Sequence, residues 1–452
     1  MLLSDIEITE ELMNERDLFG PDIDVTDASA PAPSRRRLLG WLSTGALLAV
    51  TGCGGGGGDG TEAATGGAAP SSPSTGNSQS GNSSEPGNAA APDNSAPPAT
   101  PTGTQTAVSL FNHGVAMTTL EGTPNTLPGD LNGAVFITPD NHFSYYKSKG
   151  LDHIRLEGAW ERLQPRLYGA LGEQLLDAPN DPNNPLRNPV ALVTHDLDRA
   201  KANNLKVILD LCHNYGRRYI GYNGSWANKT QVVLGSDQCP IDAFADYCVK
   251  VVQAFGSHPA VAAIDLMNEP HDMPTGGTGW RQAAQAAITA IRKVNTKIPI
   301  MVEGYNWASA EVWPNVNPDL HTLSDPNNAI IWSAHVYFDS DSSGTYGNGT
   351  QAAPSDQTIG VTRLAPFVAW LKQHGYSNFG HIGEFGAPDQ AQWQNIVKNF
   401  MTSAKSNGIA LTAHQDLPYL NDPYQMNLFP TTSSSGAITG QDHFIIAEFS
   451  AL

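Results

Sequence analysis

The sequence predicts an α/β fold, a (β/α)8 barrel of the TIM type, for residues 108–452. Short apolar runs rich in Val, Ile and Leu alternate there with longer amphipathic stretches, a pattern typical of parallel strands joined by helices. The runs are nearly continuous in apolar residues, which indicates strands that are buried on both faces. Eight such runs in about 345 residues fit a barrel with loop insertions.

The expected strands run from "HGVAMTT" to "GIALTAH" and comprise residues 113–119, 152–157, 206–212, 261–267, 298–304, 329–335, 379–385 and 408–414. The expected helices are the amphipathic stretches 195–204, 241–256, 280–295, 362–375 and 392–408. Several of these end at Gly, which helix C-termini favour. A doubly wound open sheet is the alternative, although the Gly-rich phosphate-binding turn of its nucleotide-binding members follows none of these strands.

Residues 1–53 are expected to form an export region. In "SRRRLLGWLSTGALLAVTGC", three arginines (35–37) precede about 15 mostly apolar residues, too few to span a bilayer comfortably, and the stretch ends at Cys53. It resembles a bacterial lipoprotein signal, in which the cysteine becomes acylated, and the paired arginines resemble a twin-arginine export signal. A short anchor helix with an incidental cysteine is the alternative. The resemblance implies an exported bacterial protein, either an outer-membrane lipoprotein or a secreted one.

Residues 54–107 are expected to be a disordered linker, because they consist almost entirely of Gly, Ser, Ala, Pro, Thr and Asn. The formal charge of −19 is unevenly spread: residues 1–34 carry −8, the arginine cluster +3 and the linker −4, which leaves −10 for residues 108–452. An acidic domain of this kind binds nucleic acid poorly, because phosphate contacts need Lys and Arg. A neutral polysaccharide is indifferent to this charge.

Three cysteines remain in the expected barrel domain: Cys212, Cys239 and Cys248. Export favours one disulfide, and either Cys239–Cys248 or Cys239–Cys212 is conceivable. The sequence contains no Cys-x-x-Cys pair that would indicate a metal or redox site.

Polar or ionisable side chains lie at or near the ends of most expected strands, where a barrel gathers its catalytic groups. These are Arg155, His213, Asn214, Tyr215, Asn268, Glu269, His335, Tyr337, Glu384 and His414. A single histidine at a strand end is more often structural than catalytic, but six such ends are difficult to attribute to chance.

Glu269 and Glu384 follow the fourth and seventh expected strands, so they could face each other across the barrel mouth. Paired carboxyl groups suit glycosidic bonds, since one protonates the leaving oxygen while the other attacks or stabilises the anomeric carbon. Their environments must differ, so that one stays protonated and the other ionised. Arg155, His335 and Tyr337 could hold a carboxylate ionised, and Asn268 could bind a sugar hydroxyl.

The motifs around these residues resemble a known family. "LMNEP", with "HNYG" before it and "HVY" and "IGEFG" after it, looks like glycoside hydrolase family 5, a barrel family with many endo-β-1,4-glucanases. "IRLEGAWERLQP" and "LDLCHNYGRRY" are most similar to its cellulase subfamily. The resemblance covers the whole of residues 108–452.

The resemblance implies specific roles. Glu269 would be the general acid/base and Glu384 the nucleophile of a retaining enzyme that cleaves β-1,4-glucan chains, with carboxyl groups about 5–5.5 Å apart. The family's supporting positions correspond to Arg155, His213, Asn268, His335 and Tyr337. We expect a monomer that needs no cofactor or metal and contacts a membrane only through an N-terminal lipid.

One position departs from the family, which usually has a Trp after the eighth strand where this sequence has His414. Losing an aromatic stack worth roughly 0.5–1.5 kcal/mol shifts substrate preference more readily than it abolishes activity. Trp307 or Tyr419 could substitute for it. Sugar binding and packing are equally open for Trp160, Trp226, Trp280 and Trp307, and supporting or structural roles are expected for Glu157, Glu161 and Glu303.

Three alternatives remain open. A β-mannanase or another β-glycanase of the same family is one, because loop shape decides the substrate. A metal-dependent barrel hydrolase is another, with ligands from His213, His271, His335, His381 and His414. The third is a polysaccharide-binding lipoprotein with a weakened catalytic site, which only His414 favours.

Overall fold

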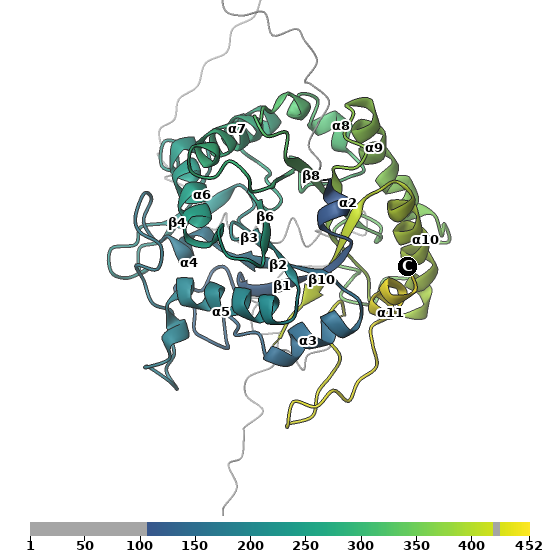
Figure 1. Cartoon of the computed structure of the whole chain (residues 1–452), viewed down its shortest axis with the longest axis horizontal. Helices are drawn as coiled ribbons and strands as arrows, with labels where there is room; N and C mark the ends of the chain where they lie inside the picture. Colours follow the sequence, from purple (N-terminus) through teal and green to yellow (C-terminus); the bar gives the residue numbers. More distant parts are fainter. Residues whose placement is uncertain (1–105, 419–424) are drawn as a thin grey trace, which may run out of the picture.

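The computed structural model describes residues 106–418 and 425–452. Eight strands of this part close into a parallel barrel in the order β1-β10-β9-β8-β7-β6-β3-β2. Figure 1 shows the helices arranged around the strands. The predicted (β/α)8 barrel is therefore confirmed. The expected export segment with Cys53, the linker up to residue 105, and Tyr419 lie outside the described residues.

The barrel strands begin within two residues of the expected positions. They are β1 (His113–Leu120), β2 (His153–Gly158), β3 (Lys206–Asp210), β6 (Val261–Asp265), β7 (Ile300–Glu303), β8 (Ile330–Tyr337), β9 (Gly380–Gly386) and β10 (Ala410–Asp416). The barrel closes where β1 pairs in parallel with both β2 and β10. Every pairing in the barrel is parallel, so all the carboxyl ends of its strands meet at one end of the barrel.

The outer layer contains each of the five expected helices. Its helices are α3 (Asp140–Ser148), α4 (Trp160–Leu163), α5 (Pro189–Ala202), α6 (Ile241–Phe255), α7 (Gly276–Val294), α8 (Trp313–Val316), α9 (Ile359–Gln373), α10 (Ala391–Ser406) and α11 (Phe444–Ala451). Helix α5 begins six residues earlier than expected, because the side chain of Asn188 caps the backbone N–H groups of Val190 and Ala191.

The core fills the space between strands and helices. Trp160 and Trp280 have no exposed surface, and Trp226 is only 6% exposed. The indole nitrogen of Trp160 donates to Gln164, and that of Trp280 donates to the backbone oxygen of Glu303. Packing is therefore the role of Trp160 and Trp280.

A short helix, α2 (Ala107–Leu110), closes the amino-terminal end of the barrel. It begins at Ala107, which is the last residue of the expected linker. Thr106 caps it, because the Thr106 side chain accepts a hydrogen bond from the backbone N–H of Ser109. Phe111 follows α2 and has no exposed surface. It packs inside the barrel with residues from the first halves of the strands: Ile208, Ala263, Met301, Ile331 and Ala410.

A two-stranded antiparallel hairpin, β4 (Arg217–Ile220) and β5 (Thr230–Val233), follows β3 and was not expected from the sequence. The guanidinium of Arg218 lies 4.5 Å from the ring of Trp160, which attaches the hairpin to the core. The hydroxyl of Tyr219 donates to Asn125 Oδ1 at 2.6 Å. The hairpin is thus joined to the loop after β1.

The expected disulfide is wrong: Cys212, Cys239 and Cys248 are all buried free thiols. Cys212 Sγ lies 3.8 Å from Met267 Sδ, and Cys248 packs on the buried face of α6. Burial supplies an apolar environment for each thiol, so these cysteines serve as small core residues.

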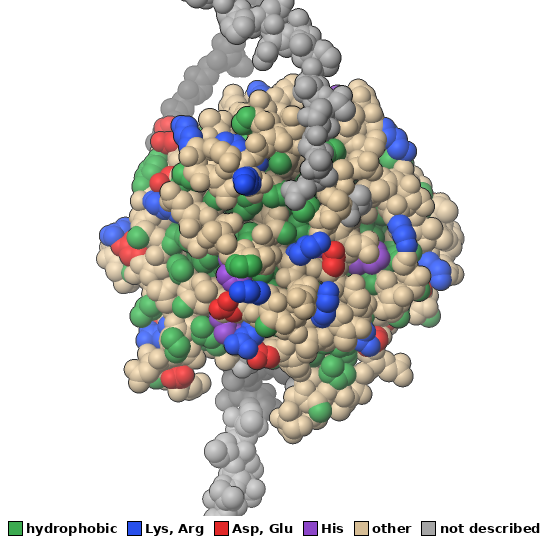
Figure 2. Space-filling model, viewed as in Figure 1, with side chains coloured by type: hydrophobic (Ala, Val, Ile, Leu, Met, Phe, Trp, Pro, Cys, Tyr) green, Lys and Arg blue, Asp and Glu red, His purple; other side chains and the backbone are tan. Residues whose placement is uncertain are grey.

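The surface carries charges of both signs. On the face seen in Figure 2, basic side chains are interspersed with acidic ones and do not gather into one basic patch. None of the helices in the described part of the chain has the length and apolar character needed to cross a bilayer.

Candidate active site

A cleft lies at the carboxyl ends of the barrel strands. Several residues expected from the sequence line it: His213, Glu269, Trp307, Tyr337, Glu384 and His414. The other expected residues, Arg155, Asn268 and His335, are at most 2% exposed and contact the lining residues from below. The structure therefore brings these nine expected residues together.

Glu269 stands at the end of the turn that follows β6. Its backbone φ of 46° is in the left-handed region, which residues other than glycine rarely adopt. Its backbone N–H donates to Glu303 Oε2 at 2.6 Å, and its Oε1 lies 2.8 Å from His335 Nδ1. These two contacts hold the carboxyl group of Glu269 toward the cleft.

Glu384 lies on β9 and is surrounded by donors. The hydroxyl of Tyr337 donates to Glu384 Oε2 at 2.7 Å, and Arg155 Nη1 donates to Oε1 at 3.2 Å. Burial alone would raise the pKa of Glu384, but His335, His414 and Arg155 hold it well below its usual range. The Glu384 carboxylate is therefore ionised at neutral pH.

The two carboxyl groups lie close together. An oxygen of Glu269, an oxygen of Glu384 and a nitrogen of His335 are all within 4.8 Å of one another. A sugar carbon bound between the two carboxylates could contact both, which is the arrangement that acid/base and nucleophilic chemistry requires.

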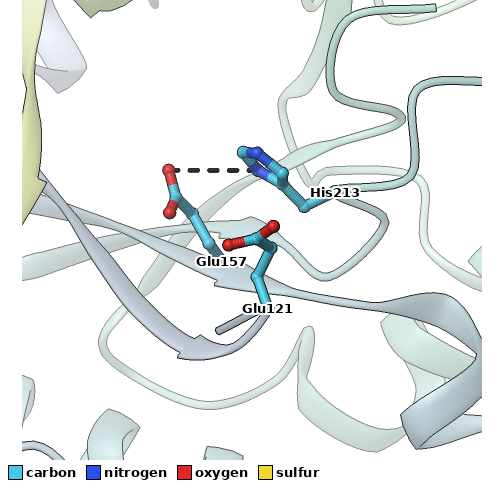
Figure 3. A group of neighbouring side chains, drawn as sticks. All are labelled: Glu121, Glu157 and His213. Carbon is cyan, nitrogen blue, oxygen red and sulfur yellow. Dashed lines mark ion pairs between the residues drawn. The ribbon is translucent and has the colours of Figure 1, made fainter. Parts of the chain in front are cut away.

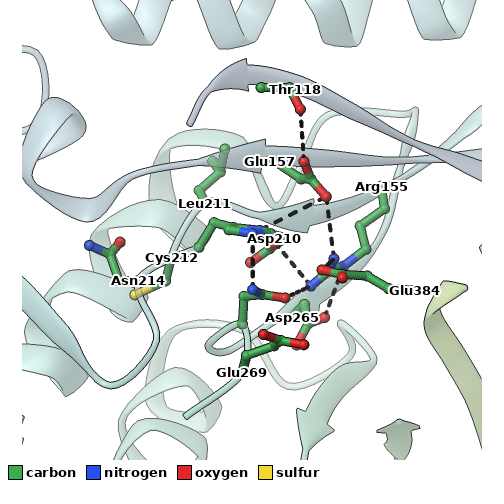
Figure 4. A network of polar contacts seen from close by, with 12 residues as sticks. Thr118, Arg155, Glu157, Asp210, Leu211, Cys212, Asn214, Asp265, Glu269 and Glu384 are labelled. Carbon is green, nitrogen blue, oxygen red and sulfur yellow. Dashed lines mark hydrogen bonds and ion pairs between the residues drawn. The ribbon is translucent and has the colours of Figure 1, made fainter. Parts of the chain in front are cut away.

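Arg155 is the centre of the polar network beneath the cleft, as Figure 4 shows. It has no exposed surface. Its guanidinium nitrogens lie 2.8–3.4 Å from the carboxyl groups of Glu157, Asp210, Asp265, Glu303 and Glu384. One permanent cation thus serves several buried acids that come from different strands.

His213 and Asn268 connect this network to the cleft wall. Asn268 accepts a hydrogen bond from Arg155 Nη2 at 2.8 Å, so its amide nitrogen faces His213 Nε2 at 2.9 Å. The other ring nitrogen of His213 lies 2.6 Å from Asp210 Oδ2. The orientations of both side chains are therefore fixed before any sugar binds.

His335 bridges the two sides of the site. Its Nδ1 contacts Glu269, and its Nε2 lies 3.0 Å from Glu303 Oε1. Burial alone would lower its pKa, but Glu303, Glu384 and Glu269 raise the pKa of His335 to about 10. A protonated His335 can donate one hydrogen bond to Glu269 and one to Glu303.

Trp307 and His414 both line the cleft. The Trp307 ring stacks on His271 at 4.3 Å, which leaves an aromatic face in the cleft. His414 lies on β10, and its ring meets that of Tyr337 edge-on at 6.3 Å. Its Nδ1 is 3.9 Å from Glu384 Oε2. The residue at the position of the family's usual Trp thus lines the cleft.

Sequence reasoning missed part of the network. Asp210 and Asp265 received no role, and Glu303 was expected only to support the site or the fold. Glu303 contacts Arg155, His335 and the backbone of Glu269. A signal was present, since the apolar strands "KVILD" and "VAAID" each end on an aspartate.

Three groups of side chains in the described residues are close enough to share a cation: Glu121–Glu157–His213, Glu157–Glu384–His414 and Glu269–His335–Glu384. Each contains one histidine. In His213 and His335 both ring nitrogens are already within hydrogen-bond distance of protein partners. We therefore interpret the groups that contain His213 and His335 as parts of the hydrogen-bonded network.

Residues 118–415 match the family described as cellulase (glycosyl hydrolase family 5). The chain belongs to glycosyl hydrolase family 5. One curated relative, a probable endo-β-1,4-glucanase B of Neosartorya fischeri, is 33% identical over 286 residues, which cover 63% of this chain and 74% of the relative. The matched region spans 57–74% of the length of the first curated relatives.

Solved family 5 structures are similar to the whole barrel. The endoglucanase Cel5A of Pseudomonas stutzeri, in complex with cellobiose, is 31% identical with a TM-score of 0.62 and covers 76% of this chain and 92% of its own. An endo-β-1,4-glucanase from Xanthomonas axonopodis pv. citri is 28% identical, also with a TM-score of 0.62, and covers 75% and 98%. Membership of family 5 makes this chain a glycosidase of the endoglucanase type.

Proposed function

We propose that the protein is a retaining endo-β-1,4-glucanase in which Glu269 is the general acid/base and Glu384 the nucleophile. The observation that carries this proposal is the approach of the two carboxyl groups to within 4.8 Å. Retaining glycosidases separate these groups by about 5–5.5 Å, whereas inverting enzymes need about 6.5–9.5 Å to admit a water molecule.

In the first step, a Glu384 oxygen attacks the anomeric carbon while Glu269 gives its proton to the glycosidic oxygen. The bond to the leaving chain breaks, its electron pair passes to that oxygen, and a glycosyl ester of Glu384 remains. The cations around Glu384 favour this role, because they keep its carboxylate ionised. Tyr337 and Arg155 orient one oxygen each.

In the second step, Glu269 acts as a base. It takes a proton from water, the water oxygen attacks the anomeric carbon, and the ester electron pair returns to Glu384. His335 contacts both Glu269 and Glu384, so it can follow the shift of negative charge from one carboxyl group to the other. The network beneath need not move during either step.

A β-1,4-glucan is the proposed substrate. The relatives are named endo-β-1,4-glucanases, and one similar structure holds cellobiose. The Trp307 face in the cleft suits the apolar face of a glucosyl ring. A reducing-sugar screen across cellulose derivatives, mixed-linkage glucan, xyloglucan and mannan would test this choice, and the highest kcat/KM on mannan would replace it with the β-mannanase alternative.

The decisive experiment substitutes the two carboxyl groups. We expect Glu384→Gln and Glu269→Gln each to lower kcat on carboxymethylcellulose by roughly 10³-fold or more, while the circular dichroism spectrum stays unchanged. Glu173→Gln is the matched control, because Glu173 pairs with Arg166 away from the cleft lining. A folded Glu384→Gln protein with full activity would refute the mechanism. An inactive wild type would favour the binding-protein alternative.

The N-terminal region is a separate proposal. We propose that residues 1–53 direct export and that Cys53 carries a lipid, so that a monomeric enzyme reaches the cell envelope or the medium. The support is the arginine-rich, apolar stretch ending at Cys53. Cys53→Ser should move the exported protein from the membrane fraction to the soluble fraction, and unchanged fractionation would argue against lipidation.

A further inference from the structure

Glu157 is a buried carboxyl group that the proposed chemistry leaves unused. It lies on β2, and its side chain has no exposed surface. We propose that Glu157 is a positioning residue for glycoside hydrolysis: as a neutral carboxylic acid, it holds His414 beside Glu384. This inference rests on the proposed function, in which Glu384 is the nucleophile.

The first observation is the place of His414 between two carboxyl groups. His414 Nδ1 lies 3.9 Å from Glu157 Oε1 and 3.9 Å from Glu384 Oε2. If both acids were ionised, they would compete for the charge of one imidazole. A neutral Glu157 does not compete with Glu384, whose pKa His414 helps to lower, and it still limits where the imidazole ring can lie.

The second observation concerns the number of protons available for the hydrogen bonds between Glu157, Thr118 and Gln415. Thr118 Oγ1 lies 3.0 Å from Glu157 Oε2 and 2.9 Å from Gln415 Oε1. Figure 4 shows the contact between Thr118 and Glu157. One hydroxyl has one proton and can donate to only one of these oxygens. If Glu157 is protonated, it donates to Thr118, which donates to Gln415, and both contacts are satisfied.

The third observation is the set of charges that face Glu157. Figure 3 shows it with Glu121 and His213. The facing groups come from five strands or the turns after them: Glu121, Arg155, Asp210, His213, Glu384 and His414. Burial, together with the negative charges of Glu384 and Asp210, raises the pKa of Glu157 to about 8 against the lowering effect of His213 and Arg155.

The pairing gives His414 a function of its own. An indole at this position would offer the sugar an aromatic face and one fixed N–H donor, whereas the protonation state and tautomer of an imidazole depend on its neighbours. Its neighbour on β10, Gln415, is the far end of the Thr118 contact. Glu157 therefore interacts with two adjacent residues of β10, with His414 directly and with Gln415 through Thr118.

The test compares Glu157→Gln, which mimics the neutral acid, with Glu157→Leu, which removes the polar contact. Each is made alone and together with His414→Ala. Asp196→Asn is the matched control, because Asp196 is another fully buried acid whose pKa burial raises, and it contacts His195 on α5. The readouts are kcat and KM on an aryl cellobioside from pH 5 to pH 9.

We expect Glu157→Gln to keep kcat within about threefold of the wild type at pH 6, and Glu157→Leu to lower it about tenfold with KM nearly unchanged. The ratio of wild-type to Glu157→Gln activity should fall as pH rises through about 8. In the His414→Ala background, Glu157→Leu should cost little more, since both residues act through one contact. Asp196→Asn should leave the ratio flat.

Two outcomes would overturn the inference. A Glu157→Gln protein that is folded but as impaired as Glu157→Leu at pH 6 would mean that the ionised carboxylate is required. If Glu157→Leu lowered kcat by the same factor in the wild-type and the His414→Ala backgrounds, the role of Glu157 would be structural only. Labelling by a 2-fluorocellobioside separates the hypotheses: absence of an adduct on Glu384 in the wild type rejects the proposed function, whereas labelled variants with independent losses reject only the positioning role.

Discussion

At the scale of the residue, Arg155 is the cation on which the charge balance beneath the cleft depends. Its side chain is fully buried and contacts carboxylates from several strands. These contacts raise its pKa well above the usual range against the effect of burial. Breaking a buried ion pair by removing one partner is costly, because the remaining charge has no solvent to stabilise it.

We expect Arg155→Met to lower the free energy of unfolding by about 3–5 kcal/mol at pH 7. The loss should be smaller at pH 5. Without Arg155, the buried acids bind protons more tightly in the folded than in the unfolded protein, so the variant loses stability as pH rises. Urea denaturation at both pH values measures this. The exposed Arg166→Met, which breaks only a surface pair with Glu173, should cost no more than about 1 kcal/mol. An equal loss from Arg155→Met at both pH values would contradict the explanation.

Most of the site could be predicted from residue types at strand ends, but the convergence of the buried acids on Arg155 could not. Glu269 and Glu384 stand where apolar runs end, which is visible in one dimension. The partners of Arg155 lie on strands separated by more than a hundred residues, such as Asp265 and Glu303. Their convergence depends on which side chains point into the barrel, and a one-residue change of register would reverse that direction.

At the scale of the element, α2 and Phe111 form a plug at the end of the barrel opposite the cleft. The Phe111 ring meets His153 edge-on at 5.1 Å. The plug excludes water from the first halves of the strands, whereas the cleft needs the opposite end to remain open. Stability and substrate binding are therefore supplied by different ends of the same strands.

Phe111→Ala should lower the free energy of unfolding by about 3–5 kcal/mol, because it opens a cavity that the surrounding strands cannot fill. The KM on a soluble glucan should not change. Denaturation midpoints and initial rates measure the two quantities, with the half-buried Leu110→Ala as a milder control. A rise in KM that parallels the loss of stability would show that the two ends are coupled.

The elements themselves were largely predictable, because alternation of apolar and amphipathic stretches is a local property. Strand starts agree within two residues. The β4–β5 hairpin escaped prediction, since "RRYIGYNGSWANKTQVV" combines short strands with a long polar turn. The disulfide prediction was wrong for a related reason. Cysteine spacing gives no side-chain direction, and all three cysteines point into packed regions.

At the scale of the whole molecule, net charge determines how the enzyme meets a polymer. The formal charge of residues 108–452 is −10. The domain therefore repels an anionic polysaccharide at long range, and salt screens this repulsion within a Debye length of about 8 Å at physiological ionic strength.

We expect the KM for carboxymethylcellulose to fall by roughly twofold when NaCl rises from about 10 mM to about 200 mM, because screening removes the repulsion. The KM for a neutral mixed-linkage glucan should not change. Initial rates at the two salt concentrations measure both, and the neutral polymer serves as the control. An equal response of the two polymers would exclude long-range repulsion as the cause.

The position of the plug, at the end of the barrel opposite the cleft, also determines where the domain can be attached to a support without blocking the cleft. Because α2 lies at the end of the barrel opposite the cleft, a bead or a carrier domain joined directly at residue 106 would leave the cleft facing outward. The C-terminal helix α11 lies beside α10 on the flank of the barrel, as Figure 1 shows. When the domain is immobilised, attachment at residue 106 therefore leaves the cleft accessible to a long polysaccharide chain.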